Sequence, residues 1–158
     1  VARVARRGDD LDFGIAKVLT RQQTGDQAHT IGDARLFTPD YASPEQVKGG
    51  PVGTQTDVYS LGAVLYELLT GRRAHRLTTY SPGELVDVIC GQDPEPLSAA
   101  ASAEFRPLLR GDLETIVAKA MEKDPARRYA SVDRLRLDLE NYLEGLPISA
   151  RPPTLSYL

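Results

Sequence analysis

The sequence has little cysteine, no long apolar run and no strong charge imbalance, and each of these features excludes a class of protein. Cys90 is the single cysteine, so the chain forms no internal disulfide, and without a Cys/His cluster nothing indicates a zinc site. No stretch approaches the roughly 18 apolar residues of a membrane span. A net charge of -3 disfavours nucleic acid as the main partner. We therefore expect a globular, cytoplasmic protein with no membrane segment in this chain and no nucleic-acid partner.

The spacing of apolar residues predicts a mainly α fold without strands. The expected helices lie close to residues 57–70, 82–89, 113–121 and 132–144. Their expected N-terminal caps, in chain order, are Thr56, Ser81, Asp112 and Ser131. Ser81 also begins a capping box with Glu84, and Gly71 suits the left-handed residue that ends the first helix. Residues 92–107 are expected to form a loop with at most an irregular helical turn.

The helix expected at 57–70 is apolar on nearly every side. Its apolar side chains are Val58, Tyr59, Leu61, Ala63, Val64, Leu65, Tyr66, Leu68 and Leu69. A helix of this kind belongs in the interior of a domain, because any exposed side would carry apolar surface. We expect it to be the core element of the chain.

Four short motifs follow one another along the chain. Asp-Phe-Gly occupies residues 12–14, and Thr-Pro-Asp-Tyr-Ala-Ser-Pro-Glu occupies residues 38–45. Asp-Val-Tyr-Ser-Leu-Gly opens the central helix at residues 57–62, and Lys-Asp-Pro-Ala-Arg-Arg-Tyr occupies residues 123–129. With these motifs in this order, the chain resembles the C-terminal half of the C-terminal lobe of a bacterial-type serine/threonine protein kinase. One tripeptide would be a weak signal, whereas four ordered motifs around a central helix are specific.

The resemblance covers about residues 9–146 and implies a division of the chain into three parts. These are a disordered N-terminal stub over residues 1–8, a partial protein kinase domain over 9–146, and a linker-like tail over 147–158. Within the partial domain the resemblance implies an activation segment over 12–45 and a helical subdomain over 54–146, around the central helix.

The Asp-Phe-Gly motif implies a metal-binding role for its first residue. Asp12 matches the magnesium ligand of the family, a hard carboxylate for a hard cation that bridges phosphate oxygens. Phe13 would pack into the lobe and set the direction of Asp12, and Gly14 would permit a tight backbone turn. The alternative for Asp12 is a carboxylate in a surface turn. Only Leu11 supplies the apolar lead-in that the family usually has before this motif.

The second motif implies contact with the substrate. Thr38 matches the threonine that, in serine/threonine kinases, orients the catalytic aspartate and lines the substrate loop. The alternative is a plain turn hydroxyl before Pro39.

Three further residues match structural positions of the family. Glu45 and Arg128 match an ion pair that links the end of the activation segment to the last helices; the alternative is two separate exposed charges. Asp57 matches a residue that holds the backbone of the catalytic loop, and the alternative is that it only caps its own helix.

Thr20, Thr24 and Thr30 lie in the expected activation loop. In the family, phosphate on this loop is drawn to basic residues and orders the segment, so all three are candidate phosphorylation sites. For each of them, an ordinary loop residue is the alternative.

Several kinase motifs do not occur within the 158 residues. There is no glycine-rich loop, no strand lysine and no His-Arg-Asp catalytic loop. His75-Arg76-Leu77 imitates part of the last motif but has no aspartate and follows the central helix. We therefore expect a fragment of an enzyme that uses ATP and Mg²⁺ to phosphorylate Ser or Thr of protein substrates. The fragment by itself is expected to bind ATP weakly or not at all and to be catalytically incompetent.

Two other readings stay open at this stage. The chain could be a non-catalytic kinase-like module that binds or regulates partners, or an unrelated helical adaptor. For the kinase fragment, a central helix that is incompletely covered predicts self-association through apolar surface. The sequence leaves open whether further chain tethers the whole protein to a membrane.

Overall fold

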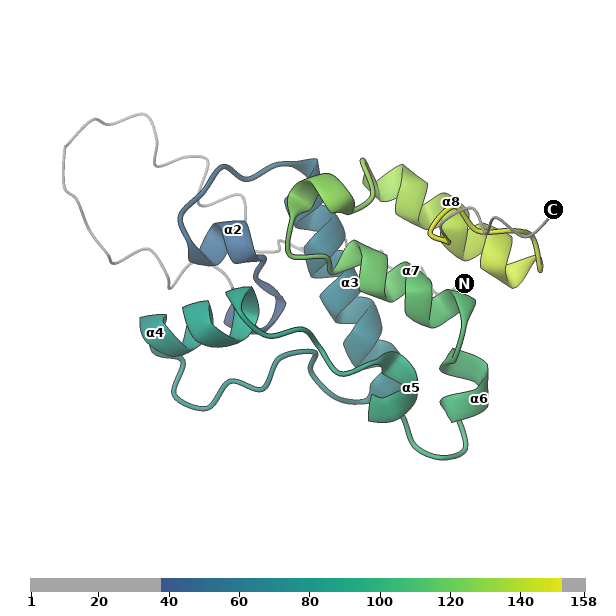
Figure 1. Cartoon of the computed structure of the whole chain (residues 1–158), viewed down its shortest axis with the longest axis horizontal. Coiled ribbons are helices and arrows are strands. Elements are labelled where there is room, and N and C mark those ends of the chain that lie inside the picture. The colour runs from purple at the N-terminus through teal and green to yellow at the C-terminus, as the bar shows by residue number, and fades with distance from the viewer. Residues whose placement is uncertain (1–37, 152–158) are drawn as a thin grey trace, which may run out of the picture. The chain divides into compact units, whose positions relative to one another are not determined.

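The computed structural model describes residues 38–151, and within this range every regular element is a helix (Figure 1). The expectation of a mainly α fold is therefore confirmed for this part of the chain. The elements in chain order are η2 (Pro39–Tyr41), α2 (Pro44–Val47), α3 (Thr54–Thr70), α4 (Pro82–Leu85), η3 (Val86–Cys90), α5 (Leu97–Ala100), α6 (Arg106–Leu109), α7 (Asp112–Ala120), η4 (Pro125–Arg127) and α8 (Val132–Leu143).

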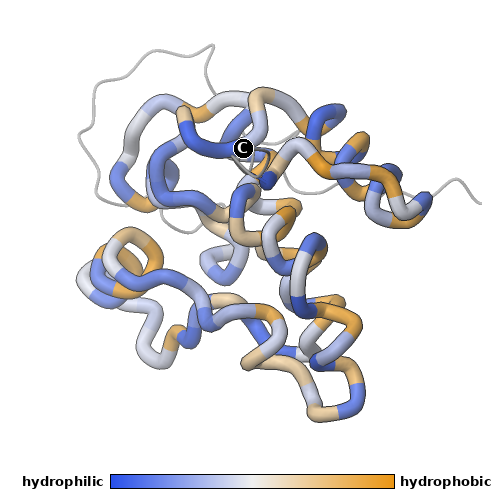
Figure 2. The backbone as a smooth tube through the Cα atoms, turned by 45° about the vertical axis from the view of Figure 1, so that its right-hand side comes forward, coloured by the Kyte–Doolittle hydropathy of each residue, from blue (hydrophilic) through white to orange (hydrophobic). Residues whose placement is uncertain are grey.

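Helix α3 is the scaffold on which the other elements pack. It contacts η2, α5, α7, η4 and α8, and Figure 1 shows it passing through the middle of the described part. Hydrophobic and hydrophilic residues alternate along the helices (Figure 2), so that each helix can turn an apolar face toward its neighbours. The central position expected for this helix agrees with these contacts.

Two apolar clusters form on different sides of α3. The larger cluster contains Tyr59, Ala63, Tyr66, Leu97, Ala100, Ala101, Leu109, Leu113, Val117 and Met121. The smaller cluster contains Val58, Ile116, Ala120, Tyr129, Leu135 and Ile148. The neighbouring residues Val58 and Tyr59 of α3 belong to different clusters, and so do Ile116 and Val117 of α7. The pair of helices α3 and α7 therefore contributes side chains to both clusters.

The start of α3 differs from the expectation. The helix begins at Thr54 with Gly53 as its N-cap, and Thr56 occupies the third helical position. The Thr56 hydroxyl accepts a hydrogen bond from the Gly53 amide at 3.1 Å and so satisfies a donor at the helix start from inside the helix. The end was predicted correctly: Gly71 has a φ of 69°, a left-handed cap that glycine adopts without strain.

Other helix starts show which caps were read correctly. Ser81 and Ser131 accept hydrogen bonds from the third helical amides of α4 and α8, as expected. The carboxylate of Glu84 does not complete the capping box and instead binds the turn before the helix. Gly111 rather than Asp112 caps α7. Residues 92–107 hold two short helices, α5 and the start of α6, where only an irregular turn was expected.

The described part of the tail packs against α8. Ile148 is buried in the smaller cluster. The buried carboxylate of Asp138 accepts hydrogen bonds from the amides of Ser149 and Ala150, both at 2.8 Å, and from the Tyr129 hydroxyl at 2.8 Å. The predicted linker-like segment is thus held to the helices over residues 148–150, and the other domain boundaries stay predictions.

Gly62 of α3 lies close to the end of α7. A Cβ at position 62 would lie 2.8 Å from Met121 Cγ and 2.9 Å from Ala120 Cβ. The Met121 side chain can shift, but the Cβ of Ala120 moves only with its helix.

We predict that Gly62→Ala lowers the free energy of unfolding, because the cost of overpacking, about 1–3 kcal/mol, exceeds the gain in helix propensity, about 1 kcal/mol. Urea denaturation followed by circular dichroism measures the change. Gly83→Ala is the matched control, since a Cβ at position 83 in α4 meets no atom within 4 Å. Equal or greater stability of Gly62→Ala would show that α3 and α7 are not in close contact.

Candidate functional site

The segment Thr38–Glu45 is held by α3, by the loop between α3 and α4, and by Arg128, which follows η4. Thr38 itself is exposed and precedes η2, and its side chain makes no capping hydrogen bond. Ser43 forms a capping box with Gln46 at the start of α2. Because the backbone around Thr38 is held by its neighbours, the Thr38 hydroxyl is presented outward from an anchored segment.

The anchor at the end of this segment is a buried ion pair between Glu45 and Arg128. The two guanidinium NH groups donate to the two carboxylate oxygens at 2.7 and 2.8 Å, and the exposed fractions of the side chains are 9% and 0%. Such a parallel two-point contact fixes both orientation and distance. The structure thus brings these two predicted residues together, in contrast to the alternative of two exposed charges.

All five N–H donors of Arg128 have acceptors. Beyond Glu45, they donate to the backbone carbonyls of Gln55, Glu122 and Lys123. The guanidinium also lies 4.8 Å from the centre of the Tyr59 ring. A fully satisfied buried cation of this kind ties α2, the start of α3 and the segment after α7 to one point.

The contacts of Glu45 lower the pKa of its carboxyl group. Burial acts to raise the pKa, but the hydrogen bonds from Arg128, from backbone and from the Thr56 hydroxyl outweigh burial and lower the pKa from 4.5 to about 2. The carboxylate therefore stays charged over the whole physiological range.

A second anchor holds the middle of the segment. Asp40 is buried, forms an ion pair with Arg73, and accepts a hydrogen bond from the Tyr80 hydroxyl at 3.0 Å. Arg73 donates to the same hydroxyl at 3.2 Å. The hydrogen bond to Asp40 raises the pKa of Tyr80. The Asp40 carboxylate thus has both a counter-charge, from Arg73, and a hydrogen-bond donor, from Tyr80, within the protein.

Tyr80 reaches Asp40 from a strained turn. Its φ of 54° lies in the left-handed region, which is unusual for an aromatic residue. The carboxylate of Glu84 supports the turn by accepting hydrogen bonds from the amides of Thr78, Thr79 and Tyr80, each at 2.7 Å, and from both threonine hydroxyls. These bonds, those of Thr78 first, lower the pKa of Glu84 to about 2. Local strain is thus compensated by local hydrogen bonds.

Helix α3 holds the segment Thr38–Glu45 through two hydrogen bonds to Tyr41. The Tyr41 hydroxyl donates to Glu67 at 2.7 Å, and the Ser60 hydroxyl donates to the Tyr41 carbonyl at 2.9 Å. The hydrogen bond to Glu67 raises the pKa of Tyr41. Both contacts come from the same helix, so the position of the segment follows the position of α3.

Asp57 is not part of these anchors. It lies exposed in the first turn of α3, and its carboxylate makes no hydrogen bond or ion pair within residues 38–151. Since Gly53 caps the helix, Asp57 does not serve as the cap of its own helix either.

The remaining predicted residues lie outside the described range. This applies to the magnesium ligand Asp12, to Phe13 and Gly14, and to the candidate phosphorylation sites Thr20, Thr24 and Thr30. Between residues 38 and 151, no group of His, Cys, Asp or Glu side chains is arranged to hold a metal ion.

Sequence reasoning missed the contacts of Asp40, Arg73 and Tyr80. Asp40 was visible inside a motif, but its partners lie 33 and 40 positions further along the chain. His75, which looked like a coincidental motif, is buried, and its Nε2 lies 2.8 Å from the Tyr59 hydroxyl. Burial lowers the pKa of His75 to about 4, so that the ring is neutral at physiological pH.

Comparison with known proteins gives concordant matches. The protein kinase domain model matches residues 11–137. The chain is 37% identical over 142 residues to a probable serine/threonine-protein kinase of Streptomyces coelicolor, covering 89% of this chain and 19% of that protein. It is 38% identical over 140 residues to the serine/threonine-protein kinase PknB of Mycobacterium tuberculosis, covering 89% of this chain and 21% of that protein.

Two further matches are more distant. The serine/threonine-protein kinase PknD of Chlamydia pneumoniae is 34% identical over 152 residues, covering 93% of this chain and 15% of that protein. A solved structure of the twitchin kinase region from C. elegans aligns with a TM-score of 0.46 and 26% identity, over 64% of this chain and 16% of that chain. The chain spans about a fifth of the length of the curated relatives it matches.

We predict that Glu45→Gln lowers the free energy of unfolding at neutral pH by about 3–5 kcal/mol, because it leaves the buried Arg128 charge without a counter-charge. Chemical denaturation from pH 7 to pH 2 measures the difference between the two proteins. The folded pKa of Glu45 lies below its ordinary value, so its contribution is complete above pH 4.5 and is lost as the pH falls toward 2.

The difference between wild type and Glu45→Gln should therefore shrink across that window by about 3 kcal/mol, which corresponds to the size of the shift. Other carboxylates titrate in both proteins and cancel in the comparison. A difference that is small at neutral pH, or that does not change between pH 4.5 and 2, would contradict the anchoring role of the pair.

Proposed function

The chain belongs to the protein kinase domain family, and we propose that it supplies the substrate-binding half of the helical lobe of a serine/threonine protein kinase. One observation carries the proposal. The ion pair between Glu45 and Arg128 joins the Ser-Pro-Glu segment to the Lys-Asp-Pro-Ala-Arg-Arg-Tyr segment, so two motifs far apart in sequence meet at the point that holds Thr38–Glu45 in place.

In the whole protein, we propose that the γ-phosphate of ATP is transferred to Ser or Thr hydroxyls of protein substrates. Thr38 would line the substrate loop and orient the catalytic aspartate, and its exposure on an anchored segment supports this role. Asp12 would be the residue that holds Mg²⁺, which neutralises phosphate charge during transfer. Asp57, exposed at the start of α3, is free to hold the backbone of a catalytic loop.

The 158 residues by themselves are proposed to transfer no phosphate. They contain no glycine-rich loop, no strand lysine and no His-Arg-Asp segment. Phosphoryl transfer relies on positioning the nucleotide and the acceptor together, and a single magnesium ligand does not position ATP.

We predict no phosphorylation of myelin basic protein above a protein-free blank when the 158-residue chain is incubated with radiolabelled ATP and Mg²⁺. The protein expressed together with its upstream coding sequence should phosphorylate the same substrate. In that longer protein, Thr38→Val should abolish transfer and Thr38→Ser should retain it. Activity of the 158 residues alone, or a fully active Thr38→Val protein, would contradict the assignment.

The second candidate function is a non-catalytic kinase-like binding or regulatory module. It is favoured by the fact that Asp40, Tyr41 and Glu45 of the segment Thr38–Glu45 are each bonded to residues of the helical part of the chain. The coding sequence directly upstream of Val1 separates the two: an in-frame glycine-rich loop and His-Arg-Asp motif indicate the enzyme.

One face of α3 supports the proposal that this chain covers only part of a larger core. Leu61, Val64 and Leu68 lie on that face and are 39%, 37% and 75% exposed.

Between residues 38 and 151 no helix is both long and apolar enough to cross a membrane. We propose that the chain functions in the cytoplasm.

We predict that the isolated chain self-associates and binds a hydrophobic dye, because exposed apolar side chains at helical spacing favour association. Sedimentation velocity and 8-anilinonaphthalene-1-sulfonate fluorescence measure both effects. Leu68→Gln should reduce them, whereas Leu143→Gln, at a leucine that is 80% exposed at the end of α8 and not on this face, should not. A monomer without dye binding would refute the prediction.

A further inference from the structure

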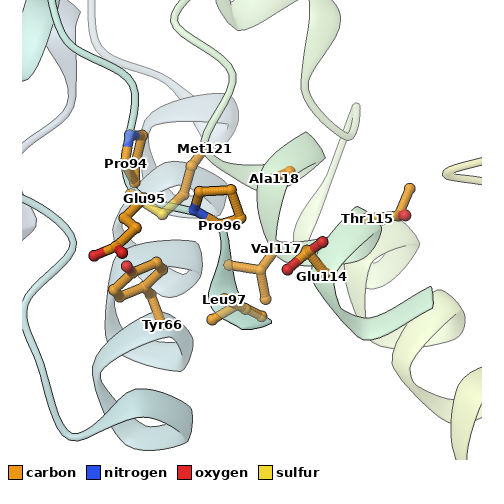
Figure 3. Close-up of a pocket in the computed structure, with 10 residues that line it drawn as sticks. All are labelled: Tyr66, Pro94, Glu95, Pro96, Leu97, Glu114, Thr115, Val117, Ala118 and Met121. Atoms are coloured by element: carbon orange, nitrogen blue, oxygen red, sulfur yellow. The ribbon is translucent and has the colours of Figure 1, made fainter. Parts of the chain in front are cut away.

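A pocket of about 350 Å³ lies between the C-terminal half of α3, the segment before α5, and α7 (Figure 3). None of its lining residues belongs to the Thr38–Glu45 segment. Its volume is within the range of small-ligand and side-chain sites. The pocket is therefore a separate feature of the fold.

The pocket is lined by a tyrosine whose hydroxyl has no hydrogen-bond partner among the described residues. Tyr66 is only 3% exposed and lines the pocket, and its hydroxyl makes no hydrogen bond within the described residues. Burial, followed by the charge of Glu95, raises the pKa of this hydroxyl, and Arg72 and Arg76 partly offset the effect. Tyr66 is thus a largely buried side chain whose hydroxyl is accessible from the pocket, where a ligand can supply its hydrogen bond.

The charge of the lining is of one sign. It includes the carboxylates of Glu95 and Glu114 and no basic side chain. In Figure 3, Glu95 lies beside Tyr66 at one end of the row of lining residues and Glu114 lies toward the other end. The amide of Ser98 donates to one oxygen of Glu114 at 2.7 Å and thereby orients its carboxylate.

Between these polar groups the lining is apolar. Leu97, Val117 and Met121 are buried members of the larger core cluster and also line the pocket. Figure 3 shows Leu97 and Val117 between the two carboxylates. An apolar stretch that leads to a carboxylate and a hydroxyl at one end matches a long aliphatic side chain with a cation at its tip.

We infer that this pocket binds an arginine or lysine side chain of a partner protein. The aliphatic stem lies on Leu97 and Val117, and the cation meets the carboxylate of Glu95 and donates an N–H to the Tyr66 hydroxyl beside it. A purely apolar ligand would remove water from the Tyr66 hydroxyl without replacing its hydrogen bond, and an anionic ligand would meet two carboxylates. The inference does not depend on phosphoryl transfer.

The test uses the 158-residue chain and a matched pair of peptides, acetyl-Gly-Leu-Arg-Leu-Gly-amide and the same peptide with citrulline in place of arginine. Citrulline keeps the shape and removes the charge. Methyl NMR follows Leu97, Val117 and Met121. We expect the arginine peptide to shift these methyl signals and to bind about tenfold more tightly than the citrulline peptide, because only the former makes charge-assisted hydrogen bonds.

Variants locate the binding. Glu95→Gln and Tyr66→Phe should each weaken binding of the arginine peptide several-fold, while Glu104→Gln, at an exposed acid outside the lining, should not. Contacts between the Leu97 and Val117 methyls in the free chain report whether the pocket is formed. Equal binding of the two peptides, no binding, an unaffected Glu95→Gln protein, or absence of these contacts would each overturn the inference.

Discussion

The rest of the structure depends on the buried contact between Glu45 and Arg128. Because Arg128 uses all five of its donors, one guanidinium connects α2, the start of α3 and the residues that follow α7. The two partners are 83 positions apart in the chain, so the contact closes the described part into one unit. A charge at this depth persists only with its full set of partners, which makes the arrangement specific as well as stable.

Helix α3 supports both apolar clusters and the Thr38–Glu45 segment. It contributes Tyr59 to the larger apolar cluster and Val58 to the smaller one, and it holds the Thr38–Glu45 segment through Ser60 and Glu67. At its far end it contributes Tyr66 to the acidic pocket. One helix thus positions both the proposed substrate segment and the proposed partner pocket.

Elements were predictable from the sequence where a local signal decides them. Gly71 ends α3 because a left-handed residue is needed there, and Ser81 and Ser131 cap their helices because their hydroxyls reach the third amide. The start of α3 at Gly53 was missed. A threonine can accept a hydrogen bond from a backbone amide either as the N-cap residue or, as Thr56 does, from the third position of the helix. The contacts of Asp138 with residues 149 and 150 were missed as well, because proline-rich composition indicated a linker.

By itself, the sequence determined the helical class, the order of the motifs and the residues that carry charge or an apolar face, since these depend on local spacing and residue type. Only the tertiary structure decided which of those charges meet. It paired Asp40 with Arg73 and Tyr80, buried His75, and placed Tyr66 in a pocket that two carboxylates also line. The physical reason is that such pairings depend on how helices approach one another, and close packing across α3 and α7 is set by many side chains at once.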